Sequence, residues 1–124
     1  MTAPGYSVCV VDDDADIREV LTDVLALEGY DVVAAGDGES ALALLRARPS
    51  RCRVILLDLM MPHMNGWEFR RQQLQDPAIA SIPVLLLTGA GTATKSIDEL
   101  QVAATIEKPV ELDALLAHVA QYCA

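Results

Sequence analysis

The sequence predicts an α/β fold in which one parallel sheet carries helices on both faces. Two short runs, residues 8–11 and 54–57, are entirely apolar and end at acidic residues. Such runs are typical of strands that are buried on both faces of a parallel sheet. Between the strand-like runs, apolar residues recur at helical spacing, so strands and helices alternate along the chain. Right-handed connections between parallel strands then place helices on both faces of the sheet.

The first half of the chain predicts three strands and two helices. After the strand at residues 8–11, five apolar residues at helical spacing predict a helix that ends at Gly29. These five residues are Ile17, Val20, Leu21, Val24 and Leu25. Asp14 or Asp16 is expected to cap or charge the first turn of this helix. The next three elements are a strand at residues 32–34, a helix around residues 41–45 and a strand at residues 53–57.

The second half of the chain predicts a loop followed by helices and strands in alternation. Pro62, Asn65 and Gly66 mark the loop, and Gly66 is expected to relax a tight or left-handed turn. The elements expected after it are a helix at residues 67–75, a strand at 83–87, a helix at 96–102, a strand at 103–106 and a helix at 112–119. Five β–α units fill the 124 residues, so residues 1–124 are predicted to form a single domain.

Composition and charge exclude several classes of function. The net charge of −9 argues against nonspecific binding to nucleic acid or to an anionic membrane, and we expect neither as a direct partner. No apolar stretch approaches the roughly 20 residues of a membrane span, and residues 1–5 lack the features of a signal peptide. Cys9, Cys52 and Cys123 have no metal-binding spacing, and their odd number does not indicate a disulfide framework. These observations predict a cytoplasmic protein.

Carboxylates gather where two of the predicted strands end. Asp12, Asp13 and Asp14 follow the first strand directly, and Asp58 follows the third. If these strands lie side by side, their carboxylates meet at one edge of the sheet, where open α/β sheets bind ligands. Close carboxylates resist joint ionisation unless a cation compensates them. The simplest compensation is a divalent metal ion.

Four motifs in this order resemble the receiver domain of two-component response regulators, in particular the single-domain chemotaxis regulators. They are VVDDD at 10–14, LLDLMMPHMNG at 56–66, LLLTG at 85–89 and KP at 108–109, each at the end of a predicted strand. The resemblance covers essentially the whole chain. It implies a flavodoxin-like fold, a three-layer (βα)5 sandwich whose five-stranded parallel sheet has the order 2-1-3-4-5.

The resemblance assigns the acidic residues to phosphoryl transfer. Asp58 matches the carboxylate that accepts a phosphoryl group, and a carboxylate oxygen is a competent nucleophile toward phosphorus. Asp12 and Asp13 match the acidic pair that holds Mg²⁺, a hard cation that prefers oxygen ligands. By this resemblance Asp13 and Asp58 bind the metal directly, Asp12 acts mainly through water, and the Met60 backbone carbonyl completes the set of protein ligands.

Two further residues complete the implied switch. Lys108, one of only two lysines, matches the cation that pairs with the phosphoryl group, and a cis peptide is implied between Lys108 and Pro109. Thr88 matches the hydroxyl that bonds to the phosphoryl group and draws in the loop behind it. The implied function is a signalling domain, not an enzyme with its own substrate, although it assists its own phosphorylation and dephosphorylation. A histidine kinase or histidine phosphotransfer protein would phosphorylate it, and a downstream protein target would receive the signal.

The chain departs from the family pattern in places that bear on signalling. Thr105 stands where receiver domains usually carry an inward-turning Tyr or Phe, and the segment from Thr88 to Lys108 is about two residues shorter than usual. We therefore expect signalling through the loop after Thr88, or through the first helix, in place of aromatic burial. The resemblance implies that Met60 and Ala90 flank the approach of the hydrolytic water, and neither side chain can hydrogen-bond a water molecule. This predicts a long-lived phosphoryl state.

Two alternative functions remain open to test. A dehalogenase-type phosphatase also forms an aspartyl phosphate, but it needs a second acid two residues after the nucleophile, where this chain has Met60. A pseudo-receiver would bind partners without phosphorylation, although all five site residues are present here. The sequence does not decide whether the chain acts alone or as part of a longer regulator or hybrid kinase.

Overall fold

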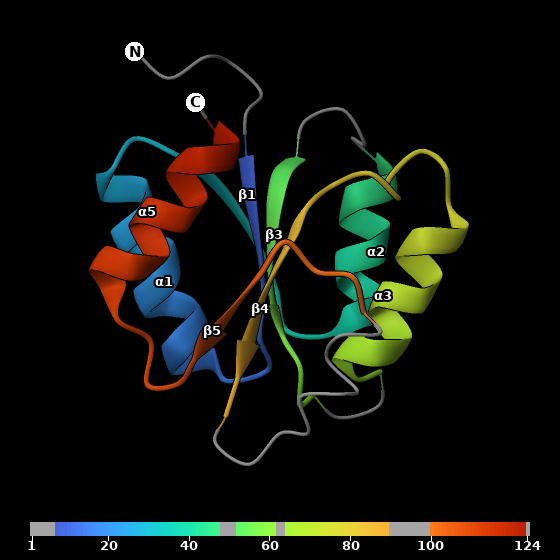
Figure 1. The fold of residues 1–124 in the computed structure, drawn as a ribbon, viewed down its shortest axis with the longest axis horizontal. Coiled ribbons are helices and arrows are strands. Elements are labelled where there is room, and N and C mark those ends of the chain that lie inside the picture. Colours follow the sequence, from blue (N-terminus) through green and yellow to red (C-terminus); the bar gives the residue numbers. More distant parts are fainter. Residues whose placement is uncertain (1–6, 48–51, 62–63, 90–99, 124) are drawn as a thin grey trace.

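A single parallel sheet organises the computed structural model, which describes residues 7–47, 52–61, 64–89 and 100–123 (Figure 1). The strands are β1 (Ser7–Val11), β2 (Asp31–Ala35), β3 (Cys52–Asp58), β4 (Val84–Thr88) and β5 (Ala104–Glu107). Their order in the sheet is β2-β1-β3-β4-β5, and every neighbouring pair is parallel. The predicted α/β class and strand order are therefore confirmed.

Helices cover both faces of the sheet. They are α1 (Ala15–Leu27), α2 (Gly38–Ala47), α3 (Gly66–Gln75) and α5 (Leu112–Cys123). Figure 1 shows α1 and α5 on one face and α2 and α3 on the other. Alternate residues of β3 point to opposite faces, so Val54 joins the core under α1 and α5 while Ile55 joins the core under α2 and α3. None of the described helices is long and apolar enough to cross a membrane.

The strand register places the carboxyl ends of β1, β3, β4 and β5 along one edge of the sheet. Val11 at the end of β1 pairs with Leu57, so Asp12 and Asp58 occupy equivalent positions on neighbouring strands. Asp58 pairs with Leu87, and Thr88 pairs with Glu107, the residue before Lys108. The fold thus brings the four motifs to one edge, as their positions predicted.

The helix boundaries follow from local capping. Asp14 is the N-cap of α1 and accepts hydrogen bonds from the backbone N–H groups of Asp16 and Ile17. Gly29 ends the same helix in the left-handed conformation, with φ of 93°, as the sequence predicted. Asn65 caps α3 by accepting from the N–H of Glu68. These caps satisfy donors that a helix start leaves unpaired.

Two predictions on the fold need correction. Gly66 does not occupy a left-handed turn, since Gly29 is the one described glycine with positive φ. A Cβ on Gly66 would lie 2.9 Å from Cα of Leu59, so close backbone approach is what requires glycine there. The predicted helix at 96–102 is not helical over residues 100–102, where Gln101 has φ of 53°, and residues 96–99 lie outside the described part of the chain.

Candidate functional site

Three carboxylates meet where β1 and β3 end, and we call Asp12, Asp13 and Asp58 the acidic rim. One oxygen from each lies within 4.8 Å of the others. Asp12 and Asp58 are buried, whereas Asp13 is exposed. Buried charges of like sign disfavour folding unless something compensates them. The structure thus confirms the juxtaposition of carboxylates that the sequence predicted.

The backbone at the end of β1 is fixed by hydrogen bonds on both sides. The Asp12 N–H donates to the Ala35 carbonyl at 3.2 Å, and Asp12 Oδ1 accepts from the Asp14 N–H at 2.9 Å. The Arg18 guanidinium donates to the Asp12 carbonyl at 2.7 Å. Sequence reasoning missed Arg18, because its partner is a backbone oxygen that no side-chain pattern reveals. These bonds orient Asp12 before any ligand arrives.

Lys108 supplies the positive charge of the site. Its Nζ lies 3.2 Å from Asp58 Oδ1 and 3.6 Å from Asp12 Oδ2, and its side chain is only a quarter exposed. The Lys108 N–H donates to the Thr88 carbonyl at 2.7 Å, which ties the end of β5 to the end of β4. The peptide bond to Pro109 is cis, as the family resemblance implied. Lys108 therefore follows β5, two strands away from β3, and its ammonium reaches the Asp58 carboxylate at the end of β3.

The electrostatics of Asp58 reflect competition between burial and charge. Burial, together with the neighbouring Asp12 carboxylate, raises the pKa of Asp58 from 3.8 to about 6, although the Lys108 ammonium opposes the shift. The Met60 N–H also donates to Asp58 Oδ1 at 3.3 Å and favours the ionised form. Asp58 is therefore mostly ionised at pH 7.

The acidic rim fits a divalent cation. Asp12 Oδ2 is buried and, among the described residues, is the one buried side-chain polar atom without a hydrogen-bond partner. The Lys108 Nζ lies 3.6 Å from this oxygen, too far for a hydrogen bond. Three carboxylates within 4.8 Å form the all-oxygen donor set that a hard cation such as Mg²⁺ prefers. Asp12, Asp13 and Asp58 are the side chains that would hold it.

The remaining predicted site residues differ in how deeply they are buried. Thr88 is buried at the end of β4, with 3% of its surface exposed, beside the strand that carries Asp58. Met60 is 65% exposed, and Thr105 is exposed on β5, so no aromatic side chain turns inward at that position. Ala90, which was expected to flank the water approach, lies outside the described residues.

Sequence reasoning also missed a pair of polar residues on α3. Arg70 and Gln73 are both buried, with 6% and 0% exposure. Their spacing could have predicted this burial. Residues 66, 69, 70 and 73 fall on one face of the helix, and the apolar Phe69 indicates that this face points toward the core. The burial was not predicted because arginine and glutamine side chains are ordinarily exposed.

Comparison with known sequences identifies the family of the chain. The family model described as the response regulator receiver domain matches residues 8–120. The phosphate regulon transcriptional regulatory protein PhoB of Pseudomonas aeruginosa is 33% identical over 117 residues, covering 93% of this chain and 50% of its own length. The DNA-binding response regulator MtrA of Mycobacterium tuberculosis is 38% identical over 115 residues, covering 90% and 48%. The chain thus spans about half the length of these curated relatives.

Solved structures agree with the sequence comparison. A response regulator receiver protein from Pseudomonas putida superimposes with a TM-score of 0.85 at 29% identity, covering 97% of this chain and 99% of that one. The chemotaxis protein CheY4 of Vibrio cholerae gives 0.84 at 29% identity, covering 94% and 98%. With its strand order and the motifs at the strand ends, the chain belongs to the response regulator receiver domain family.

Proposed function

We propose that residues 1–124 act as one receiver domain in which Asp58 accepts a phosphoryl group in a Mg²⁺-dependent reaction. The observation that carries this proposal is the ion pair of 3.2 Å between Asp58 and Lys108, at a rim where two further carboxylates lie within 4.8 Å. Nucleophile, cation and metal-binding oxygens are then within reach of one phosphorus atom. Phosphoryl transfer needs this combination, because its catalysis is mainly positioning and charge stabilisation.

The proposed chemistry is a direct displacement at phosphorus. An Asp58 carboxylate oxygen attacks the phosphorus of a phosphohistidine, and the P–N bond of the donor breaks. The electron pair of that bond stays on the imidazole nitrogen, and the product is a mixed anhydride on Asp58. Lys108 stabilises the charge on the equatorial phosphoryl oxygens. Bound Mg²⁺ would neutralise the acidic rim and the incoming phosphoryl oxygens.

Thr88 is the proposed link between phosphorylation and a change of surface. Its position at the end of β4, beside the strand that carries Asp58, supports a hydrogen bond from its hydroxyl to the phosphoryl group. The Thr88 carbonyl already accepts from the Lys108 N–H at 2.7 Å, so movement at Thr88 is coupled to β5. The exposed Thr105 supports signalling without aromatic burial.

The proposed phosphoryl donor is a histidine kinase or a histidine phosphotransfer protein. An apolar groove of about 360 Å³ lies beside Lys108 between α1 and the start of α5, and it suits a helix of such a donor. It is lined by Asp16, Ile17, Val20, Leu21, Lys108, Pro109, Val110 and Leu112. The curated relatives are named as transcriptional or DNA-binding regulators, so they give no support to the expectation that the protein avoids nucleic acid. A downstream protein target remains part of the proposal.

Intact-mass spectrometry after incubation with acetyl phosphate tests the proposed function. We expect one phosphoryl adduct with Mg²⁺, and none in the Asp58→Asn variant or after metal chelation. An adduct that persists in the Asp58→Asn variant would contradict the assignment of Asp58. A folded wild-type protein that forms no adduct and binds no Mg²⁺ would favour the phosphorylation-independent interaction module.

A further inference from the structure

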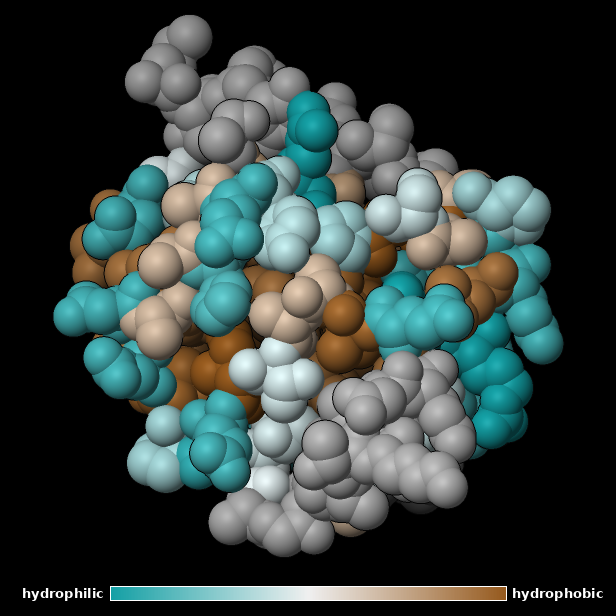
Figure 2. Space-filling view, viewed as in Figure 1, coloured by the Kyte–Doolittle hydropathy of each residue, from teal (hydrophilic) through white to brown (hydrophobic). Residues whose placement is uncertain are grey.

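Lys108 depends on a strand that has little support of its own. β5 has four residues, lies at the edge of the sheet and pairs with β4 alone. Only Ile106 of its residues is buried. Figure 2 looks onto this side of the molecule, where hydrophobic residues reach the surface between hydrophilic ones. A short, exposed edge strand is expected to open locally unless other contacts hold it.

The buried Arg70 guanidinium makes contacts with the chain just before β5. Its Nε donates to the Leu100 carbonyl at 3.0 Å, and its Nη2 donates to the Gln101 carbonyl at 2.9 Å. No carboxylate among the described residues is within ion-pair distance of Arg70. Burying an arginine without an acidic partner is costly, so its hydrogen bonds must hold it in place.

Gln73 completes the contacts of Arg70 and ties them to the connection between α3 and β4. Arg70 Nη1 donates to Gln73 Oε1 at 2.8 Å. Gln73 Nε2 in turn donates to the carbonyls of Ile79 at 2.9 Å and Ile82 at 3.0 Å. We call Arg70 and Gln73, with the carbonyls of Leu100 and Gln101, the Arg70 brace. A buried network in which every guanidinium nitrogen has a hydrogen-bond partner is rigid.

The brace fixes the chain where it re-enters the sheet. Gln101 has φ of 53°, a left-handed conformation that a residue other than glycine adopts only when its surroundings hold it. Two residues later the Ala103 N–H donates to the Val84 carbonyl at 2.9 Å, and β5 begins. At its other end β5 is held by the bond from the Lys108 N–H to Thr88. The strand is therefore anchored before its first residue and after its last.

The same helix is fixed to the segment that follows Asp58. The Gly66 N–H, at the start of α3, donates to the Leu59 carbonyl at 2.8 Å, and the absent Cβ of Gly66 permits this approach. A continuous set of contacts thus runs from Asp58 through Leu59 and α3 to Arg70, then through Gln101 and β5 to Lys108. The ion pair between Lys108 and Asp58 closes this circuit.

We propose that Arg70 is a positioning residue for the phosphoryl site, and that it keeps Lys108 beside Asp58 by anchoring the start of β5 to α3. This proposal rests on the proposed function in one respect, namely that Lys108 stabilises a phosphoryl group. The anchoring itself is a property of the protein without ligand, so it is testable even if Asp58 accepts no phosphoryl group.

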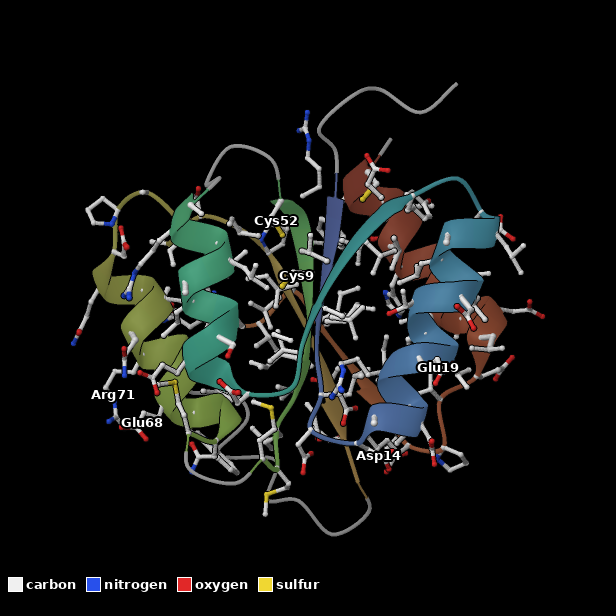
Figure 3. All side chains as sticks on the ribbon, turned by 180° about the vertical axis from the view of Figure 1, so that it is seen from behind. Cys9, Asp14, Glu19, Cys52, Glu68 and Arg71 are labelled. Carbon is white, nitrogen blue, oxygen red and sulfur yellow. The ribbon has the colours of Figure 1, made fainter. Side chains whose placement is uncertain are left out.

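The test compares Arg70→Met with Arg71→Met, both without metal. Arg71 is the neighbouring arginine but is exposed, and Figure 3 shows it on the outer side of α3, away from the sheet. Hydrogen exchange reports the opening of β5, and the side-chain Cε signal of Lys108 reports its surroundings. The chain has two lysines, so a Lys95→Arg variant assigns that signal.

In Arg70→Met we expect β5 amides to exchange about 10- to 100-fold faster, while those of β1 and β3 keep their wild-type rates. In the wild-type background, Asp58→Asn should shift the Lys108 signal, and in the Arg70→Met background this shift should be much smaller. Arg71→Met should match the wild type in both measurements. Phosphorylation by acetyl phosphate should also slow in Arg70→Met.

Wild-type exchange of β5 and an undiminished response of the Lys108 signal, in folded Arg70→Met, would overturn the proposal. If Arg70→Met does not fold, Arg70→Lys serves in its place, because an ammonium does not reproduce the planar set of donors. Faster β5 exchange in that variant supports the proposal, and wild-type behaviour in both measurements overturns it.

Discussion

The acidic rim and the Arg70 brace are polar clusters with buried members, but they differ in how their charge is compensated. The rim sets three carboxylates against one lysine and leaves Asp12 Oδ2 without a hydrogen-bond partner. The brace surrounds one guanidinium with carbonyl and amide oxygens, each at 2.8–3.0 Å. A cluster of carboxylates with too little positive charge is stabilised by binding a cation, whereas a cluster in which every guanidinium nitrogen is hydrogen-bonded makes the structure more rigid. The rim is thus suited to binding a ligand and the brace to holding the fold.

The largest expected effect comes from removing Lys108, whose ammonium pairs with Asp58 in the rim. Lys108→Met should slow phosphorylation by acetyl phosphate about 100- to 1,000-fold, because a preorganised charge toward the phosphoryl oxygens is lost. The rate of adduct formation at saturating Mg²⁺ measures this effect. An unchanged rate would show that the Lys108 ammonium does not stabilise the phosphoryl group during transfer.

The brace should show its effect in stability. Arg70→Met leaves the carbonyls of Leu100 and Gln101 unpaired, so the free energy of unfolding should fall by about 2–4 kcal/mol. Arg71→Met should change it by less than about 0.5 kcal/mol, because that side chain is exposed. Urea denaturation of both variants gives the comparison. If Arg70→Met and Arg71→Met are equally stable, the hydrogen bonds of the buried Arg70 do not add to stability beyond what an apolar side chain provides.

Removing a carboxylate from the acidic rim should increase the free energy of unfolding, whereas removing Arg70 should decrease it. The pKa of Asp58 rises from 3.8 to about 6 on folding, so the folded metal-free protein binds a proton more tightly than the unfolded chain. This contribution to stability is complete below about pH 4 and is lost as the pH rises through 6. Asp58→Asn should therefore stabilise the metal-free protein at pH 7, by about 1–3 kcal/mol.

Thermal unfolding without metal, measured from pH 4 to pH 7.5, tests this stabilisation. The difference between Asp58→Asn and the wild type should grow between pH 4 and pH 6 and then level off. Added Mg²⁺ should stabilise the wild type more than the variant, since it binds the folded rim. A stability difference that does not change with pH would show that ionisation of Asp58 does not destabilise the folded protein.

The smallest expected effect concerns the lifetime of the phosphoryl group. Met60 is 65% exposed beside Asp58 and offers a water neither a donor nor a strong acceptor. Met60→Asn should speed loss of the phosphoryl group several-fold, since an amide can orient the water. The decay of the adduct mass after removal of acetyl phosphate measures this rate. Slower or unchanged loss would exclude residue 60 as a control on hydrolysis.

The two clusters also differ in how far the sequence predicted them. The rim was predictable because Asp12 and Asp58 each follow an apolar strand directly, and parallel strands bring such positions to one edge. The brace was not, because the partners of Arg70 are backbone carbonyls about 30 residues away, and a carbonyl has no sequence signature. The α/β class followed from apolar periodicity, whereas the strand order was taken from the family resemblance. The left-handed turn expected as one alternative at Gly66 was wrong, because the close approach of Leu59 that requires glycine there has no signature in the sequence.

Chemical trapping of the phosphorylated residue tests the central claim most directly. Borohydride reduces an aspartyl phosphate to homoserine, so peptide mass mapping after reduction identifies the residue that carried the phosphoryl group. With acetyl phosphate and Mg²⁺, homoserine should appear at position 58 and nowhere else, and it should be absent without metal. Homoserine at position 12 or 13, or a phosphoryl adduct that borohydride leaves intact, would contradict Asp58 as the acceptor.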